Sequence, residues 1–221
     1  MNPSTAVRVT QRIPNLLTLF FSISLVLGFS SLANQFNWRT APSFDIRVWN
    51  DVLTLLGFAT TLYFVISVWL AFSVLVERNP YTLSFGRFYF DAARFGLMFA
   101  ILMWSFLAGV PPYFHYYIFG LAVWHLMMVL WYVNGVRNTS GDLRSERMRD
   151  LTIHGLGVLV YAILGIAYYV SVARSWVDGQ SQTLYVSFVL VTLAVVVWRT
   201  SRRLSELRTR VMQESGQVAE A

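Results

Sequence analysis

The chain has 221 residues, of which 56% are hydrophobic and only 13% are charged. A typical soluble domain carries roughly 25% charged residues, and disordered, collagen-like or coiled-coil chains need more charge, Pro or Gly, so the composition argues for an integral membrane protein. There are no cysteines and all 17 basic residues are Arg. A disulfide scaffold, a thiolate metal site, a Schiff-base lysine and a P-loop lysine are therefore excluded.

Six segments have the length and apolar composition of membrane-spanning helices, which need about 20 residues to cross roughly 30 Å of hydrocarbon. They run over about 14–33, 52–76, 95–110, 113–136, 151–173 and 183–198. The third and fourth spans share one uncharged stretch, which we expect Pro111 and Pro112 to break at a tight turn. The sequence predicts an all-α, polytopic integral membrane protein, with six transmembrane helices packed in one bundle over residues 1–198.

The distribution of arginines predicts the orientation. With the N-terminus inside, the cytoplasmic segments hold 14 of the 17 arginines, and the opposite side holds only Arg39, Arg47 and Arg174. Short loops with such a bias orient membrane proteins with the basic side inward. We expect both termini in the cytoplasm of a multi-pass protein of the cell membrane, of the bacterial inner or plasma type. The net charge of +6 is then explained by topology and not by nucleic-acid binding.

An amphipathic segment precedes the third span. Phe85, Phe88, Tyr89 and Ala92 recur at helical spacing on one face, and Arg87, Asp91 and Arg94 lie on the other. The pattern predicts a helix that lies in the membrane interface as an anchor, with an exposed Asp91–Arg94 pair that contributes a few tenths of a kcal/mol. The alternative is that Asp91 is buried against another helix or another subunit.

Two further cytoplasmic segments carry charge. Residues 137–150 alternate in sign and predict a short solvated helix or turn. Residues 199–221 predict a basic helix that continues the sixth span and becomes frayed beyond about Gln213. Its arginines would attract anionic lipid at about 1 kcal/mol per residue near the surface. The side chains expected to contact lipid headgroups are Arg87, Arg199, Arg202 and Arg203.

Few ionisable residues lie within the predicted spans. His125 lies in the fourth span, where Tyr132 and Asn134 give the helix a polar side, and His154 opens the fifth span. An intramembrane ionisable group is a functional candidate, although a single His is more often hydrogen-bonded to a neighbouring helix. With these span boundaries the two histidines differ in depth by about 12 Å, so no haem or metal is expected between them. No cofactor is predicted.

The sequence leaves three classes of function open. The first is a non-enzymatic membrane subunit that assembles with itself or with partner membrane proteins, for which small residues spaced four apart would allow close helix packing. The second is a channel or facilitator without ionisable coupling residues. The third is a membrane enzyme acting on a lipid or quinone at the cytoplasmic interface. The candidate polar residues are His125, His154, Asp91, Arg94 and Asn134.

Overall fold

The computed structural model describes residues 3–35, 49–78, 85–137, 140–174 and 182–219. Every element in these ranges is helical, which confirms the all-α class. The elements in chain order are α1 (Pro3–Gln35), α2 (Trp49–Arg78), α3 (Phe85–Trp104), the 3-10 turns η1 (Ser105–Gly109) and η2 (Pro111–Tyr113), α4 (Phe114–Arg137), α5 (Gly141–Ala173) and α6 (Gln182–Ala219).

Five of these helices are long and apolar enough to cross a membrane. Their apolar stretches are Asp51–Ser73, Tyr89–Gly109, Phe114–Arg137, Arg147–Ala173 and Leu184–Ser205. The described apolar part of α1 is shorter and covers Phe21–Asn34. The chain therefore has five to six helices that could span a membrane, in agreement with a polytopic membrane protein.

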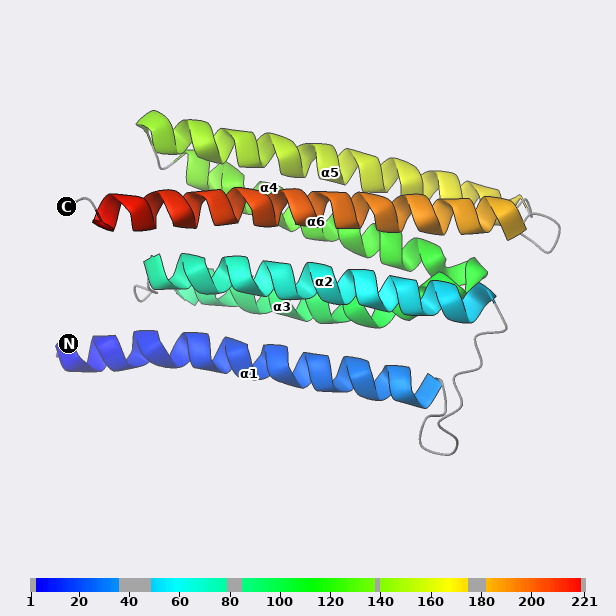
Figure 1. Cartoon of the computed structure of the whole chain (residues 1–221), viewed down its shortest axis with the longest axis horizontal. Coiled ribbons are helices and arrows are strands. Elements are labelled where there is room, and N and C mark those ends of the chain that lie inside the picture. Colours follow the sequence, from blue (N-terminus) through cyan, green and yellow to red (C-terminus); the bar gives the residue numbers. More distant parts are fainter. Residues whose placement is uncertain (1–2, 36–48, 79–84, 138–139, 175–181, 220–221) are drawn as a thin grey trace.

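The six helices lie side by side and alternate in direction (Figure 1), with α1 at one edge and α5 at the other. The most extensive packing joins α4 to α5, while α6 packs against α2 and α1 packs against α3. Both chain ends lie at the same end of the bundle (Figure 1), which we call the termini end. The end that holds η1 and η2 is called the opposite end.

A tight turn separates α3 from α4 at the opposite end, where the sequence predicts a break at the double proline. The backbone N–H of Tyr113 donates to the Val110 carbonyl over 3.0 Å, which closes the turn. The turn packs directly on α2, because a Cβ added to Gly57 would lie 2.6 Å from the Ser105 carbonyl oxygen. Only a glycine allows this close approach of two backbones.

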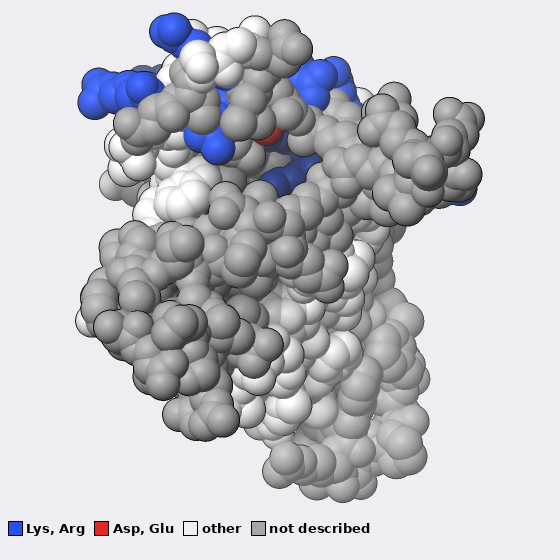
Figure 2. Space-filling view, turned by 90° about the vertical axis from the view of Figure 1, so that its left-hand side faces the viewer, with Lys and Arg blue, Asp and Glu red and all other residues white. Residues whose placement is uncertain are grey.

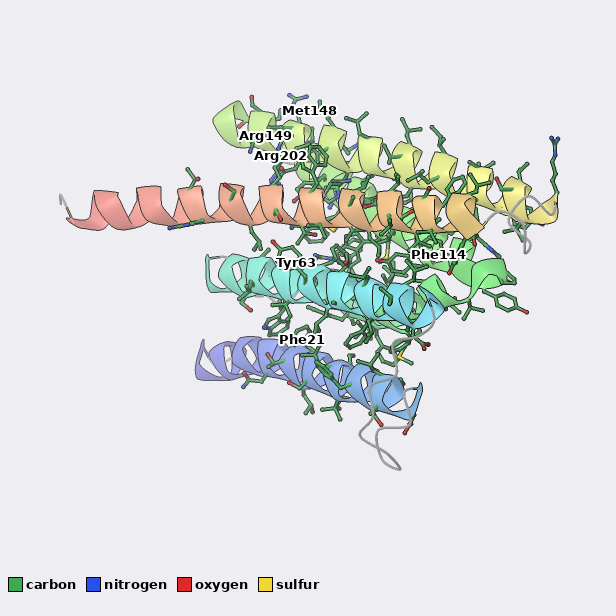
Figure 3. The ribbon with its side chains drawn as sticks, turned by 45° about the vertical axis from the view of Figure 1, so that its right-hand side comes forward. Phe21, Tyr63, Phe114, Met148, Arg149 and Arg202 are labelled. Atoms are coloured by element: carbon green, nitrogen blue, oxygen red, sulfur yellow. The ribbon has the colours of Figure 1, made fainter. Side chains whose placement is uncertain are left out.

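The core is rich in aromatic side chains that join neighbouring helices. Phe21 of α1 points toward α2 (Figure 3) and stacks on Trp69 with ring centroids 4.6 Å apart. Phe64 of α2 meets Trp124 of α4 edge to face at 5.5 Å. In a bundle surrounded by lipid, such close contacts provide the van der Waals packing that holds helices together.

Four helices extend further than the sequence suggests. α1 begins at Pro3, eleven residues before the predicted first span. The segment expected to lie in the interface forms the first turns of α3, which begins at Phe85 and continues into the span. The charged segment after residue 137 forms the first turns of α5, which begins ten residues before the predicted fifth span at Leu151. The tail expected to fray beyond Gln213 remains helical in α6 up to Ala219.

Candidate functional site

The site contains two histidines, His125 on α4 and His154 on α5, that contact each other. The Nδ1 atoms of His125 and His154 are 2.9 Å apart, and both side chains are buried. The expected depth difference of about 12 Å is therefore wrong. Because α5 begins at Gly141, His154 lies 13 residues after the start of its helix, while His125 lies 12 residues before the end of α4 at Arg137. A short antiparallel connection brings the two to the same depth.

Arg199 of α6 joins the histidine pair. Its Nη1 lies 3.1 Å from Nε2 and 3.4 Å from Nδ1 of His125. A guanidinium only donates hydrogen bonds, so His125 accepts from Arg199 through a ring nitrogen. Nδ1 of His125 also faces Nδ1 of His154. These contacts join three helices, α4, α5 and α6.

A tyrosine stacks on each histidine ring. Tyr161 lies over His125 with an interplanar angle of 8°, and Tyr132 lies over His154 with an angle of 20°. Gly157 makes this arrangement possible, since a Cβ at that position would lie 2.1 Å from Nη1 of Arg199 and 2.8 Å from the His125 ring. The missing side chain of Gly157 provides the space that the guanidinium and the imidazole occupy.

Asp91 and Arg94 form a second charged group near this site. Their side chains pair at 2.9 Å between Oδ1 and Nη1, and the residues are only 3% and 7% exposed. The expected exposed interfacial anchor is therefore wrong, and the alternative of a buried Asp91 holds. The helical repeat explains why, because Asp91 and Arg94 fall on the same face of α3 as the buried Phe95 and Met98.

The Arg94 guanidinium lies over the ring of Trp124, with its Cζ 5.3 Å from the centroid. Two N–H donors here, Nε of Arg94 and Nε1 of Trp124, are buried without an acceptor among the described residues. Such unpaired donors are rare in native proteins and call for an explanation, an unseen bound group among them. The region around Trp124 thus has more hydrogen-bond donors than acceptors.

A cavity of about 220 Å³ lies beside the histidine pair, between α2, α4, α5 and α6. Its wall contains the two histidines, their stacked tyrosines Tyr132 and Tyr161, and Trp124. The charged side chains in the wall are Asp150, Arg199, Arg202 and Arg203. The formal charges of these three arginines and one aspartate sum to +2.

The cavity lies toward the termini end and reaches the surface of the bundle. Figure 2 looks at that end and shows arginines around a recess, with further basic atoms and an acidic patch inside it. Arg202 lies toward the same end of α6, far from Phe114 at the opposite end (Figure 3). Trp198, which also lines the cavity, is 61% exposed, so the cavity opens beside it.

The other candidate residues from the sequence lie apart from this site. Asn134 is exposed on α4 and does not line the cavity. The side chain of Arg87 lies outside the described part of the chain. No group of three or more metal-ligating side chains occurs among the described residues. The structure thus gathers His125, His154, Arg199 and Arg203 into one site, with the Asp91–Arg94 pair beside it.

Sequence reasoning assigned Arg199 and Arg203 to the headgroup surface and did not place them in a site. A signal for their burial is nevertheless present, because Thr192, Val196, Arg199 and Arg203 follow one another at helical spacing. The first two of these are core residues. The arginines therefore continue the inward face of α6 toward the cavity.

Comparisons of the chain with protein-family models, with curated proteins and with solved structures find no match. The function is therefore argued from the geometry of the site alone.

Proposed function

We propose that this chain is an integral membrane protein that binds an anionic ligand in the cavity between α2, α4, α5 and α6. The observation that carries the proposal is the net charge of +2 in a wall formed by transmembrane helices. Charged side chains within membrane-spanning segments are expensive and mark binding sites or pathways. Guanidinium groups bind phosphate and carboxylate groups through paired, charge-assisted hydrogen bonds.

In this proposal the bundle spans the cell membrane six times, with both termini in the cytoplasm. The placement of 14 of the 17 arginines in the segments assigned to that side supports this orientation. The position of both chain ends at one end of the bundle agrees with an even number of spans (Figure 1). The cavity would then open toward the cytoplasmic leaflet.

The orientation is tested by reporter fusions after Ala33, Val76, Val110, Val136, Ala173 and Trp198. We expect the reporter to alternate between the two sides of the membrane. Two neighbouring fusions that report the same side would contradict the six-span topology.

Binding, rather than catalysis or conduction, is the function that the site supports best. The site supplies positive charge and N–H donors, which suit an anion without a reaction step. Toward the opposite end, the rings of Phe114, Tyr117 and Tyr168 are fully buried and pack on one another, which favours a closed cavity over a pore. We propose a non-enzymatic subunit that assembles with itself or with partner membrane proteins around this ligand.

The test is ligand-dependent stability of the purified protein in mild detergent. Two anionic probes are titrated separately, inorganic phosphate and a short-chain phosphatidylglycerol, and thermal unfolding is followed. A ligand at about 100 times its Kd stabilises a folded protein by about 2.7 kcal/mol. We expect saturable stabilisation by at least one probe in the unmodified protein, and its loss in Arg199→Gln.

Arg208→Gln is the matched control, since Arg208 is exposed on the same helix and does not line the cavity. It should retain the stabilisation. If neither probe stabilises the unmodified protein, or if both variants respond as the unmodified protein does, the cavity is not an anion site.

A further inference from the structure

Resting on the proposed function, we infer that the ligand is the phosphate headgroup of an anionic phospholipid that enters the cavity sideways between α5 and α6. α5 packs along α4 and α6 packs along α2, while α5 and α6 touch each other only at a few positions. Both helices nevertheless contribute to the cavity wall. The cavity therefore lies along the seam between two helix pairs, and in this proposal the seam faces the bilayer.

Side chains at the seam are suited to the boundary between headgroups and acyl chains. Trp198 and Arg202 line the cavity and are exposed, and the Arg202 guanidinium lies 6.0 Å from the Trp198 ring centroid. Tryptophan is enriched at membrane interfaces, and arginine there contacts lipid phosphates. A headgroup that moves along this surface would meet Arg202 first and Arg199 further in.

The depth of the arginines agrees with a lipid phosphate. Arg199 lies six residues before the end of the apolar stretch Leu184–Ser205. At 1.5 Å per residue this is about 9 Å from its end, and Arg203 is closer to that end. The arginines thus lie near one edge of the hydrocarbon, where the headgroups of that leaflet begin, and not at the bilayer centre.

The size of the cavity restricts what can enter. A volume of about 220 Å³ corresponds to roughly seven water molecules at about 30 Å³ each. This accommodates a polar headgroup, whereas the acyl chains must remain outside in the bilayer. The site therefore selects a ligand that is anionic at one end and apolar at the other.

The hydrogen-bonding groups select oxygen acceptors. Trp124 lines the cavity, and its buried Nε1 has no acceptor among the described residues. In this proposal a phosphate oxygen supplies that acceptor. The net charge of +2 also favours a headgroup without its own cation. Phosphatidylglycerol meets these requirements, while phosphatidylcholine carries a positive choline that the arginines would repel.

The experiment is a lipid titration of the delipidated protein in mild detergent, with bound lipid counted by native mass spectrometry. Three probes are compared: phosphatidylglycerol, phosphatidylcholine with the same acyl chains, and inorganic phosphate as a competitor in large excess. The proteins are the unmodified chain, the double variant Arg199→Gln/Arg203→Gln, and the exposed control Arg208→Gln.

We expect one tightly bound phosphatidylglycerol per chain, which phosphate does not displace. Phosphatidylcholine should bind to the unmodified protein at least about tenfold more weakly than phosphatidylglycerol does. Phosphatidylglycerol should bind to the double variant more weakly by a similar factor, because charge-assisted hydrogen bonds are lost. Arg208→Gln should bind phosphatidylglycerol as the unmodified protein does. Should the double variant fail to fold, a photoactivatable phosphatidylglycerol on the unmodified protein must label peptides of α5 and α6 that line the cavity.

Displacement of the lipid by phosphate, or binding of phosphate alone, would make the ligand a soluble anion; the lipid inference would then fail while the proposed anion site stands. Equal binding of the two lipids, an equal loss in Arg208→Gln, or labelling away from the seam would also overturn the inference. Absence of saturable binding by any probe would overturn both proposals.

Discussion

The two ends of the bundle bury polar groups in different ways. At the opposite end, neutral hydroxyl groups bond to each other and to backbone carbonyls: Thr61 bonds to the Tyr117 hydroxyl over 2.8 Å, and the Tyr185 hydroxyl donates to the Ala108 carbonyl. Toward the termini end, charged and titratable groups are buried or half-buried, beside the hydroxyl groups of Ser67 and Thr200. We call the first set, with Thr54 and Ser105, the hydroxyl region, and the second the polar cluster, which comprises Asp91, Arg94, His125, Tyr132, His154, Arg199 and Arg203.

The difference agrees with packing at the opposite end and with the proposed anion site toward the termini end. Each hydroxyl bond of the hydroxyl region stabilises the bundle by about 1 kcal/mol, and its loss exposes no charge. Burial of a charged group is costly, and an ion pair that replaces apolar packing often gives no gain in stability. Stability therefore does not explain why Arg199 and Arg203 line a cavity together with two histidines. Binding of an anion there would.

The largest effect should follow from breaking the buried ion pair of α3. Asp91→Asn leaves Arg94 charged and unpaired, and should lower the free energy of unfolding by about 3–5 kcal/mol. Arg94→Gln should have a similar effect, and the double variant should recover part of the loss, because no lone charge remains. Unfolding in mild detergent measures all three.

The exposed control Arg208→Gln should change the free energy of unfolding by less than about 1 kcal/mol. Small and additive losses in the Asp91 and Arg94 variants would contradict the burial of this pair. They would instead support the interfacial anchor that the sequence predicts for the first turns of α3.

Alanine substitutions at two glycines, one toward each end of the bundle, test the difference between the ends. A Cβ at Gly57, beside the hydroxyl region, would lie 2.6 Å from the Ser105 carbonyl oxygen, which is backbone and not a flexible side chain. Gly57→Ala should therefore destabilise the bundle by about 1–3 kcal/mol. Gly157→Ala meets side chains instead, so we expect a smaller loss of stability together with loss of anion binding as Arg199 is displaced.

The matched control for Gly157→Ala is Gly155→Ala on the same helix, where a Cβ has no neighbour within 4 Å. It should be neutral or stabilise by up to about 1 kcal/mol, since Ala favours the helix. Thermal unfolding and anion titration of the three variants separate stability from binding. Retained anion binding in Gly157→Ala would show that Arg199 does not hold the ligand.

The sequence predicts much of the fold because long apolar stretches and the double proline are local signals. It predicts the site poorly, because the site depends on helix starts that hydropathy does not reveal. The first turns of α5 are charged, so they resemble a loop, yet the helix begins at Gly141. Those ten residues change the depth assigned to His154 relative to His125, and so conceal their contact.

A second limit concerns the direction in which charged side chains point. Near a membrane edge, an arginine on an amphipathic helix suits the headgroups and the bundle interior equally well by sequence. For Arg94 and Arg199 the choice is made by partners on other helices, Trp124 and His125. The helical spacing of the core positions on α3 and α6 does predict that these arginines point inward. The prediction requires that the spacing be extended beyond the apolar residues to the charged ones.

Substitutions at His125 should lower the free energy of unfolding by an intermediate amount. His125→Gln retains a hydrogen-bonding side chain between Arg199 and His154, so we expect assembly to be preserved with a loss of about 1 kcal/mol. His125→Leu leaves both neighbours without that partner and should cost about 1–3 kcal/mol. Unfolding in detergent distinguishes the two substitutions. Equal losses would show that the imidazole acts through packing on Tyr161 and not through hydrogen bonds.

The smallest effect should come from the hydroxyl region itself, in Tyr117→Phe. The ring of Tyr117 is fully buried and remains in place, and only its hydroxyl is lost. Thr61 keeps its hydrogen bond to the Gly57 carbonyl at 2.7 Å, so no buried donor is left unpaired. We therefore expect a loss below about 1 kcal/mol and unchanged anion binding. A loss as large as that of Asp91→Asn, or weaker binding of the anion, would mean that the two ends are coupled through α4, which carries both Tyr117 and His125, and that the hydroxyl region supports the ligand site as well as the packing.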